Sequence, residues 1–225
     1  MASLDFVKRL QTRGILFDLD GVLVDSTPCL RRAWHEWAAG AGVDPVRTFA
    51  LGKGRTTLDH LRLAAPALAT PDEARALDAL EAAHAGLVMA MPGAADALFS
   101  LPSDRYGVVT SCSRAVALTR LRTAGLAPPA VLVAADDVAR PKPAPDGYRE
   151  GCVRLGLPPE SVLVFEDAPA GVTAARAAGC RVVELTGGEP AGPAPGAPAG
   201  DRIRDLARVQ FTTTPTDVQV ILTPS

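Results

Sequence analysis

The hydrophobic positions of this chain fall into short runs, and over most of its length these runs alternate with segments whose pattern predicts helices. Apolar runs lie at 15–17, 107–110, 130–134, 162–165 and 181–185. Helices are expected over 94–101, 114–124, 146–155 and 169–178. Short apolar runs are typical of buried strands, and strands that alternate with helices form a parallel sheet covered on both faces. The expected fold class is α/β, with a doubly wound parallel sheet.

The stretch from 26 to 91 breaks this alternation, because its pattern predicts helices only. Ser26 or Thr27 can cap a first helix that has Pro28 in its first turn and ends at the glycines of 40–42. Further helices are expected over 58–65 and from 70 to about 89. We interpret 26–91 as a helical cap inserted into an α/β core that consists of 1–25 and 92–225.

The C-terminal part of the chain has two features of its own. The segment Gly187–Gly200 is rich in proline, glycine and alanine, which predicts a mobile loop. Two β-rich runs, Val209–Thr213 and Val218–Leu222, flank a proline-containing turn and predict a terminal hairpin.

Composition narrows the functional class. The chain has 225 residues, 48% of them hydrophobic, and a net charge of −2, so nothing favours binding to nucleic acid or to a membrane. No apolar run is long enough to span a bilayer, and the first residues lack the apolar centre of a signal peptide. The cysteines have neither C-x-x-C nor metal-ligand spacing, which indicates reduced thiols. We expect a cytoplasmic monomer.

Two aspartates follow the first apolar run directly. Residues two apart in an extended chain point to the same side, so Asp18 and Asp20 should project together from the carboxyl end of the strand. Open parallel sheets bind their ligands at that end. Carboxylates so close repel each other unless a cation lies between them or they share a proton. A solvated turn, helped by the flexible Gly21, is the ordinary alternative.

A hydroxyl-rich segment ends the run at 107–110. Ser111 and Cys112 stand between this expected strand and the next helix, where a hydroxyl and free N–H groups can meet an anion. Ser113 could equally be an ordinary helix cap. Thr110 is the alternative anion-binding hydroxyl, because strand ends cannot be placed to one residue from sequence.

A lysine stands alone among three prolines in Arg140-Pro141-Lys142-Pro143-Ala144-Pro145. Prolines restrict the backbone and exclude helix from this stretch. Only three of the 23 basic residues of the chain are lysines, and a compact ammonium fits places where the planar guanidinium of arginine does not. The segment therefore suggests a positioned positive charge, with an incidental surface charge as the alternative.

Two adjacent acids, Glu166 and Asp167, end the run at 162–165. Magnesium prefers oxygen ligands and typically takes one or two carboxylates from a protein. The acids could also be a charge pair at the N-terminus of the helix that follows Pro169.

Together these segments resemble the four motifs of the haloacid dehalogenase superfamily of phosphotransferases. The matching stretches are D-L-D-G-V-L-V-D-S at 18–26, T-S-C-S at 110–113, K-P-A-P at 142–145 and V-F-E-D-A-P-A-G at 164–171. They occur in the order that the family has. The resemblance implies a Rossmann-like core with a small helical cap, and activity on small phosphorylated metabolites, as in sugar-phosphate phosphatases and β-phosphoglucomutases.

The resemblance also implies a role for each residue. Asp18 would attack phosphorus and form an aspartyl-phosphate, and Asp20 would act as general acid and base. Mg²⁺ would be bound by Asp18, Asp167 and the backbone carbonyl of Asp20, with Glu166 beside the metal. The groups that would bind the phosphoryl oxygens are Ser111, the N–H of Cys112, and Lys142.

The expected cap contains one candidate segment, Gly52-Lys53-Gly54-Arg55. Its two cations could belong to a solvated loop, or to the turn with which a cap contacts its substrate. The resemblance favours the second reading, with Arg55 facing the substrate and Lys53 at a position where many relatives have histidine. The histidines and tryptophans of the cap are expected to pack its interior.

The sequence therefore predicts a magnesium-dependent phosphatase of small phosphate monoesters, with sugar or polyol phosphates as the expected substrates. A mutase of the β-phosphoglucomutase type is the first alternative. The mutases have a histidine where this chain has Leu30, which can neither donate a hydrogen bond nor titrate. A non-catalytic phosphosugar-binding module is the second alternative, although a protein that only binds need not keep an acid at position 20.

Overall fold

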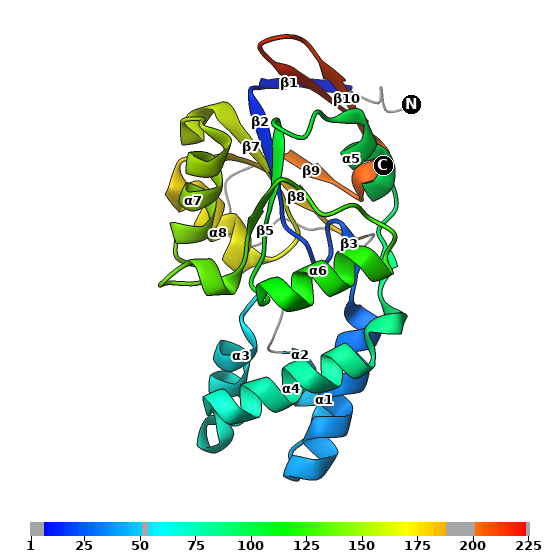
Figure 1. Cartoon of the computed structure of the whole chain (residues 1–225), viewed down its shortest axis with the longest axis vertical. Coiled ribbons are helices and arrows are strands. Elements are labelled where there is room, and N and C mark those ends of the chain that lie inside the picture. Colours follow the sequence, from blue (N-terminus) through cyan, green and yellow to red (C-terminus); the bar gives the residue numbers. More distant parts are fainter. Residues whose placement is uncertain (1–6, 51–53, 188–200, 224–225) are drawn as a thin grey trace, which may run out of the picture.

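The computed structural model describes residues 7–50, 54–187 and 201–223. It consists of an α/β core and a helical cap, which lie at opposite ends of the long axis (Figure 1). The core contains a six-stranded parallel sheet in the order β6-β5-β2-β7-β8-β9. This confirms the expected fold class. Within the described residues no helix has the length and apolar character needed to cross a membrane.

The sheet is centred on β2 (Gly14–Phe17), whose residues are all buried. The other strands are β5 (Tyr106–Val109), β6 (Val131–Val133), β7 (Val162–Glu166), β8 (Arg181–Leu185) and β9 (Asp201–Ile203). The helices that cover it are α5 (Ala94–Ser100), α6 (Arg114–Thr123), α7 (Asp146–Leu155) and α8 (Pro169–Ala178). Sequence patterns predicted these strands and helices except β9, which is short and contains a single apolar side chain.

The two faces of the sheet bury different apolar clusters because neighbouring strand residues point to opposite sides. Phe17 lies in the cluster that includes Ala97 of α5 and Leu121 of α6. Leu16 lies in the second cluster, with Tyr148 of α7. Burying one such side chain stabilises the fold by about 1.5–3 kcal/mol, so helices on both faces hold β2 firmly in place.

The cap consists of helices with an apolar interior of their own. They are α1 (Thr27–Ala41), α2 (Pro45–Ala50), α3 (Thr57–Ala64) and α4 (Pro71–Ala83). Trp34, Leu61 and Leu77 are at most 2% exposed and pack in a cluster separate from the two of the core. The cap is therefore stabilised largely by its own packing.

A two-stranded pair closes the ends of the helical insert. Strand β3 (Val24–Asp25) pairs antiparallel with β4 (Met89–Ala90), which brings the two connections to the core side by side. The helix expected from 70 to about 89 is shorter in the structure, because α4 ends at Ala83. After α4 the chain forms a 3₁₀ turn, Ala85–Leu87, and pairs with β3 only at Met89 and Ala90.

The C-terminal hairpin is present, as β10 (Val209–Thr213) and β11 (Val218–Leu222). A third strand, β1 (Lys8–Thr12), pairs with β11 and was missed in the sequence analysis. Its residues K-R-L-Q-T are mostly exposed, so the strand lacks the apolar run that would have identified it. The loop expected over Gly187–Gly200 lies outside the described residues, apart from Gly187.

Candidate active site

The sheet order places three of the four motifs at neighbouring strand ends. Strand β2 lies between β5 and β7, with Phe17 in register with Val108 and Phe165. Asp18, the next residue, donates its backbone N–H to the carbonyl of Phe165 at 2.9 Å. The residues after β2, β5 and β7 therefore meet at one edge, on the side of the sheet where parallel folds bind ligands.

Lys142 is the centre of a buried charge cluster at this edge. Its Nζ donates to Asp18 Oδ1 at 2.6 Å, to Glu166 Oε1 at 2.7 Å and to the carbonyl of Val109 at 3.1 Å. The side chain of Lys142 is 5% exposed. Tyr148 adds a hydrogen bond from its hydroxyl to Glu166 Oε1 at 3.0 Å. The proline-rich loop thus places the ammonium between two of the predicted acids.

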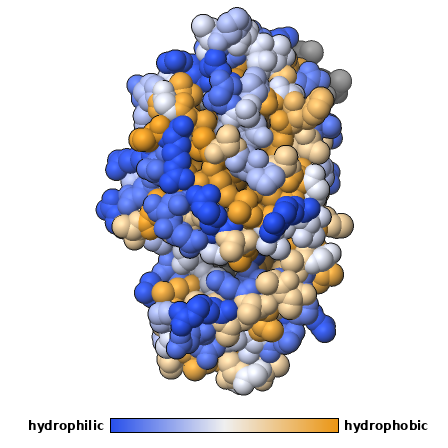
Figure 2. Space-filling model, in the orientation of Figure 1, coloured by the Kyte–Doolittle hydropathy of each residue, from blue (hydrophilic) through white to orange (hydrophobic). Residues whose placement is uncertain are grey.

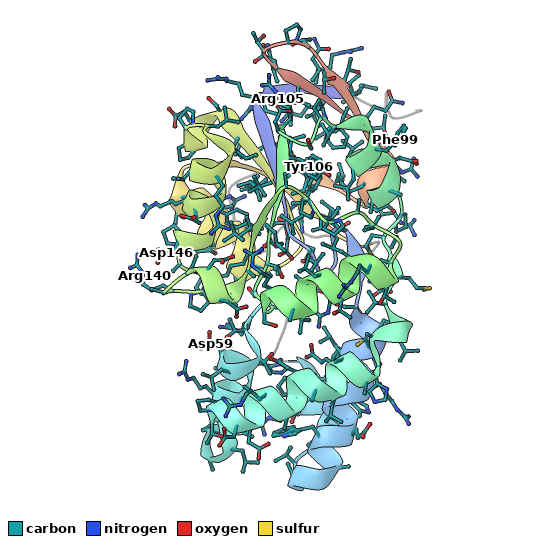
Figure 3. All side chains as sticks on the ribbon, viewed as in Figure 1. Asp59, Phe99, Arg105, Tyr106, Arg140 and Asp146 are labelled. Carbon is teal, nitrogen blue, oxygen red and sulfur yellow. The ribbon has the colours of Figure 1, made fainter. Side chains whose placement is uncertain are left out.

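The loop that carries Lys142 is fixed on its outer side by an ion pair. Arg140 donates to both carboxylate oxygens of Asp146 at 2.9 and 2.7 Å, and the two side chains lie together at the edge of the core (Figure 3). Bidentate pairs of this kind restrict geometry as well as adding energy. The pair joins the two ends of the loop, with Lys142 between them.

Glu166 has hydrogen bonds to both of its carboxylate oxygens. Oε1 accepts from Lys142 and Tyr148, while Oε2 accepts from the backbone N–H groups of Asp167 at 2.8 Å and Ala168 at 2.9 Å. These bonds shape the turn that carries Asp167. Oxygen atoms of Asp18, Glu166 and Asp167 nevertheless lie within 4.8 Å of one another, close enough to share one cation.

The charge balance of this cluster favours a bound cation. Burial raises the pKa of Asp18 well above its ordinary value, Glu166 adds to the rise, and Lys142 opposes it. Burial lowers the pKa of Lys142, but Asp18 and Glu166 raise it more, so the ammonium stays charged. A single ammonium does not offset the clustered carboxylates, since Asp167 and Asp20 also raise the pKa of Asp18. A hard divalent cation with oxygen ligands fits this donor set.

Gly21 allows the first and fourth motifs to approach each other. Its φ of +83° lies in the left-handed region, which favours glycine. A Cβ at this position would lie 2.1 Å from Oδ2 of Asp167. A side chain here would therefore clash with the carboxylate that the cation cluster requires.

The hydroxyl-rich segment after β5 lines one cavity together with Asp18, Asp20 and Asp167, through Thr110, Ser111 and Cys112. Ser111 Oγ donates to the carbonyl of Gly54 in the cap at 3.1 Å. The backbone N–H of Cys112 donates to Thr110 Oγ1 at 3.2 Å. Both candidate hydroxyls therefore face the site, and Ser111 also links it to the cap.

The cap and the core enclose a cavity of about 380 Å³, near the waist between the two parts in Figure 2. Asp18, Asp20 and Asp167 contribute to its core wall. The lining groups from the cap include Thr27, Leu30, Trp34, Phe49, Arg55, Thr57 and His60. The structure brings Arg55 to the cavity, while Lys53 lies outside the described residues.

Two cap side chains that were expected to pack the interior of the cap also line the cavity. Trp34 and His60 stack with ring centroids 3.6 Å apart, and both line the cavity as well as packing inside the cap. Burial lowers the pKa of His60, and its Nε2 lies 2.6 Å from the carbonyl oxygen of Thr48. A neutral imidazole can only donate to a carbonyl, so we assign the proton to Nε2.

Comparison with models of protein families shows to which family the chain belongs. The model described as haloacid dehalogenase-like hydrolase matches residues 12–179. The chain belongs to this hydrolase family. The match covers all four motifs, so the resemblance inferred from them is confirmed.

Several relatives within the haloacid dehalogenase-like hydrolases align with most of the chain. Hexitol phosphatase A of Escherichia coli is 41% identical over 181 residues, which cover 78% of this chain and 84% of the relative. Validoxylamine A 7'-phosphate phosphatase of Streptomyces hygroscopicus is 40% identical over 184 residues, covering 76% and 84%. The crystal structure of CbbY from Rhodobacter sphaeroides in complex with phosphate has a TM-score of 0.72 at 27% identity, covering 87% and 95%.

Two buried charges of this haloacid dehalogenase-like chain were missed by the motif analysis. Arg120 of α6 donates to Asp20 Oδ2 at 2.7 Å and to Glu81 Oε2 of α4 at 2.6 Å. One signal was available in the sequence, because Arg120 follows Ala117 by three residues and precedes Leu121 on the inner face of α6. An arginine on an apolar helix face indicates a buried partner, but its partner in another helix could not be named.

Proposed function

We propose that this chain is a magnesium-dependent phosphatase that hydrolyses sugar or polyol phosphates through an aspartyl-phosphate. The observation that carries the proposal is the contact of Asp18 with Lys142 at the base of a cavity that the cap closes from the other side. A carboxylate held in this way can attack phosphorus while an ammonium beside it binds the phosphoryl oxygens.

The nucleophile in this proposal is Asp18. Lys142 takes its Oδ1, which leaves Oδ2 for the attack or for a metal. Burial and the acids around it raise the pKa of Asp18, which makes its carboxylate more basic. The phosphoryl group would lie between Lys142 and the segment after β5, where Ser111 Oγ and the N–H of Cys112 can turn from their present partners to phosphoryl oxygens. Thr110 is the alternative hydroxyl.

The proposed Mg²⁺ ligands are the carboxylates of Asp18 and Asp167 and the backbone carbonyl of Asp20. Glu166 lies in the same cluster, but both of its carboxylate oxygens already accept hydrogen bonds from neighbouring groups. We therefore propose that Glu166 positions Lys142 and the turn at Asp167. When bound, the ion would offset negative charge on the phosphoryl oxygens.

The general acid and base in this proposal is Asp20. Its Oδ2 accepts from Arg120, while Oδ1 is buried and has no hydrogen-bond partner among the described residues. Buried polar atoms are almost always paired, so an unpaired carboxylate oxygen at the cavity suggests a bond completed by substrate. Oδ1 would give its proton to the leaving alkoxide and later take one from the attacking water.

The cap would recognise the part of the substrate remote from phosphorus. Thr27, Thr57 and the exposed Arg55 offer hydrogen bonds in the cavity, and Leu30 and Trp34 add apolar groups to its lining. Such a lining suits a polyhydroxylated carbon chain or ring. The names of the two relatives above, a hexitol phosphatase and a validoxylamine phosphate phosphatase, support the same substrate class. We also propose that 26–91 moves as the cap about the paired strands β3 and β4.

A panel of phosphate esters tests the proposal. We expect inorganic phosphate to be released from sorbitol 6-phosphate and hexose phosphates in the presence of Mg²⁺, and not after its removal by EDTA. Leu30 lines the cavity at the position where the mutases have histidine, so β-glucose 1-phosphate should not be isomerised even with a bisphosphate primer. Isomerisation faster than phosphate release would favour the mutase. Binding of these esters without turnover would favour the non-catalytic module.

A further inference from the structure

A buried arginine outside the four motifs joins the cap to the core. Arg120 lies on α6 of the core, and its side chain is 5% exposed. Its Nη1 donates to Asp20 and its Nη2 to Glu81, a residue of α4 in the cap whose side chain is 6% exposed. The two ends of one guanidinium are therefore occupied by carboxylates from two different parts of the molecule.

The contact between Arg120 and Glu81 lies beside a second cavity between α4 and α6. This second cavity has a volume of about 290 Å³, and Glu81 and Arg120 line both cavities. Most of the remaining residues around the second cavity have small side chains; they are Cys29, Asp78, Ala79, Ala82, Ala85, Ser113, Ala115, Val116 and Thr119. The contact of Arg120 with Glu81 therefore lies between the two cavities and joins α4 to α6 there.

Glu81 contacts a second helix of the cap, α1, as well as belonging to α4. Its backbone carbonyl accepts from Cys29 Sγ of α1 at 3.3 Å, and the indole of Trp34 in α1 is near enough to its carboxyl to lower the pKa of Glu81. Its position therefore follows the cap helices α1 and α4. The guanidinium is planar and its donors are fixed relative to one another, so a displacement of Glu81 changes the hydrogen bond that reaches Asp20.

We propose that Arg120 is a positioning residue that links the position of the cap to the orientation of Asp20, with Glu81 as the contact on the cap. With the cap closed, Arg120 is held at both ends and fixes Oδ2 of Asp20, so that Oδ1 is directed toward the leaving oxygen of the substrate. When α4 moves away, Arg120 keeps only one of these two partners and Asp20 loses its fixed orientation. This inference rests on the proposed function for the role of Asp20.

The kinetic test uses Arg120→Met, Glu81→Gln and the double variant in the full chain, with Mg²⁺ present. For sorbitol 6-phosphate we expect Arg120→Met to lower kcat by about 10–100-fold with KM changed by less than about threefold, because proton transfer is impaired and binding is not. For 4-nitrophenyl phosphate, whose leaving group needs no proton, the phosphorylation step in a single turnover should fall by less than about threefold.

The pair is tested by combining the variants. Glu81→Gln should lower kcat by about three- to tenfold in the wild-type background and by less than about twofold in Arg120→Met, since its effect passes through that arginine. The near-isosteric Glu81→Gln also keeps the test informative if Arg120→Met does not fold. Arg114→Met is the matched control: Arg114 is on the same helix and pairs with Asp137 within the core at 2.6 Å.

Cap position is read independently of activity. The chain has two tryptophans, so Trp37→Phe leaves Trp34, which lines the cavity and contacts Glu81, as the only indole. We expect quenching of its fluorescence by acrylamide to increase in Arg120→Met and Glu81→Gln, and to be unchanged in Arg114→Met.

The outcomes separate this inference from the proposed function. A wild-type chain without phosphatase activity would overturn the proposed function, and the fluorescence of Trp34 would still test the contact between cap and core. An active wild type with equal losses on both esters, or with additive effects of Glu81→Gln and Arg120→Met, would overturn the positioning role of Arg120. Unchanged quenching in both variants would overturn the link to cap position.

Discussion

The two walls of the cavity differ in how their polar groups are held. On the core wall, Asp18 lines the cavity, and Lys142 behind it donates to both Asp18 and Glu166 at 2.6 and 2.7 Å. On the cap wall, Arg55 is exposed and Thr57 is half-buried, with its hydroxyl bonded to Asp78 at 2.9 Å. The core groups therefore keep a fixed geometry before a substrate arrives, whereas a group such as Arg55 can adjust to the ester that enters.

This difference matches the separate packing of the two parts. The core wall stands on strands buried between two apolar clusters, while the cap is stabilised by its own cluster around Trp34 and Leu77. Changes in the cap interior should thus leave the core geometry intact. We infer that reaction chemistry belongs to the core wall and substrate selection to the cap wall, and the predictions below test this division.

The largest effect is expected on the core wall, from Asp18→Asn. The amide has nearly the same shape but is a poor nucleophile, so phosphate release should fall by at least about a thousandfold with every ester. The variant should be folded, because burial and Glu166 already raise the pKa of Asp18 and a neutral amide removes that repulsion. Phosphate release and thermal unfolding of the same preparation provide the two measurements. Residual activity above about one per cent would contradict the role of Asp18.

The second effect is the response to divalent cations. Magnesium at about 100 times its Kd should stabilise the folded chain by about 2.7 kcal/mol, or about 5 °C or more in Tm. Asp167→Asn should lose most of this shift, because it removes one carboxylate from the cluster. Calcium should bind without supporting turnover, since it accepts more oxygens in looser geometry and can take both oxygens of Asp18. Equal rates with either ion would show that the cation site has been assigned incorrectly.

The third prediction distinguishes the cap wall from the core wall by comparing two substrates. Arg55→Ala should lower kcat/KM for sorbitol 6-phosphate by about 10–100-fold, the loss of one charge-assisted hydrogen bond of about 1.5–3 kcal/mol. The loss with 4-nitrophenyl phosphate should be much smaller, because that ester lacks the distal hydroxyls. Arg62→Ala is the control: Arg62 is also in the cap, but it pairs with Asp59 of α3, labelled in Figure 3. Equal losses on both esters would mean that Arg55 binds the phosphoryl group and does not select the substrate.

The core wall could be predicted largely because its information is local. Asp18 and Asp20 follow a four-residue strand, and strand geometry places them on one edge without knowledge of the rest of the chain. Lys142 was found from its proline-rich surroundings. Its contact with Glu166, by contrast, depends on the distance between two loops, which no sequence pattern contains.

The seam between the parts was not predicted, for a physical reason. Arg120 and Glu81 are 39 residues apart and meet only because α4 docks beside α6. Helical periodicity assigns each residue to a face of its own helix and gives no information on how two helices are placed. Strands β1 and β9 were missed for a related reason, since pairing with β11 and β8 holds them rather than an apolar pattern of their own.

The smallest effect concerns the pH dependence of stability at this seam. Burial raises the pKa of Glu81 to about 7, Arg120 opposes the rise, and Asp78 and Asp20 add to it. A carboxyl whose pKa is raised by folding contributes its full stability below the ordinary value near 4.5 and loses it as pH rises through about 7. Gln does not titrate, so the free energy of unfolding of Glu81→Gln relative to wild type should increase from pH 5 to pH 8.

We expect this relative change to be about 1–2 kcal/mol, measured by urea unfolding of both proteins at the two pH values. Asp78 has a raised pKa as well and is present in both proteins, so its own burial contributes to both curves. Glu73→Gln, on the same helix α4 and bonded to Trp37 within the cap, should show no such change. A constant difference between Glu81→Gln and wild type would mean that Glu81 stays charged over this range, and hence that its pairing with Arg120 outweighs its burial.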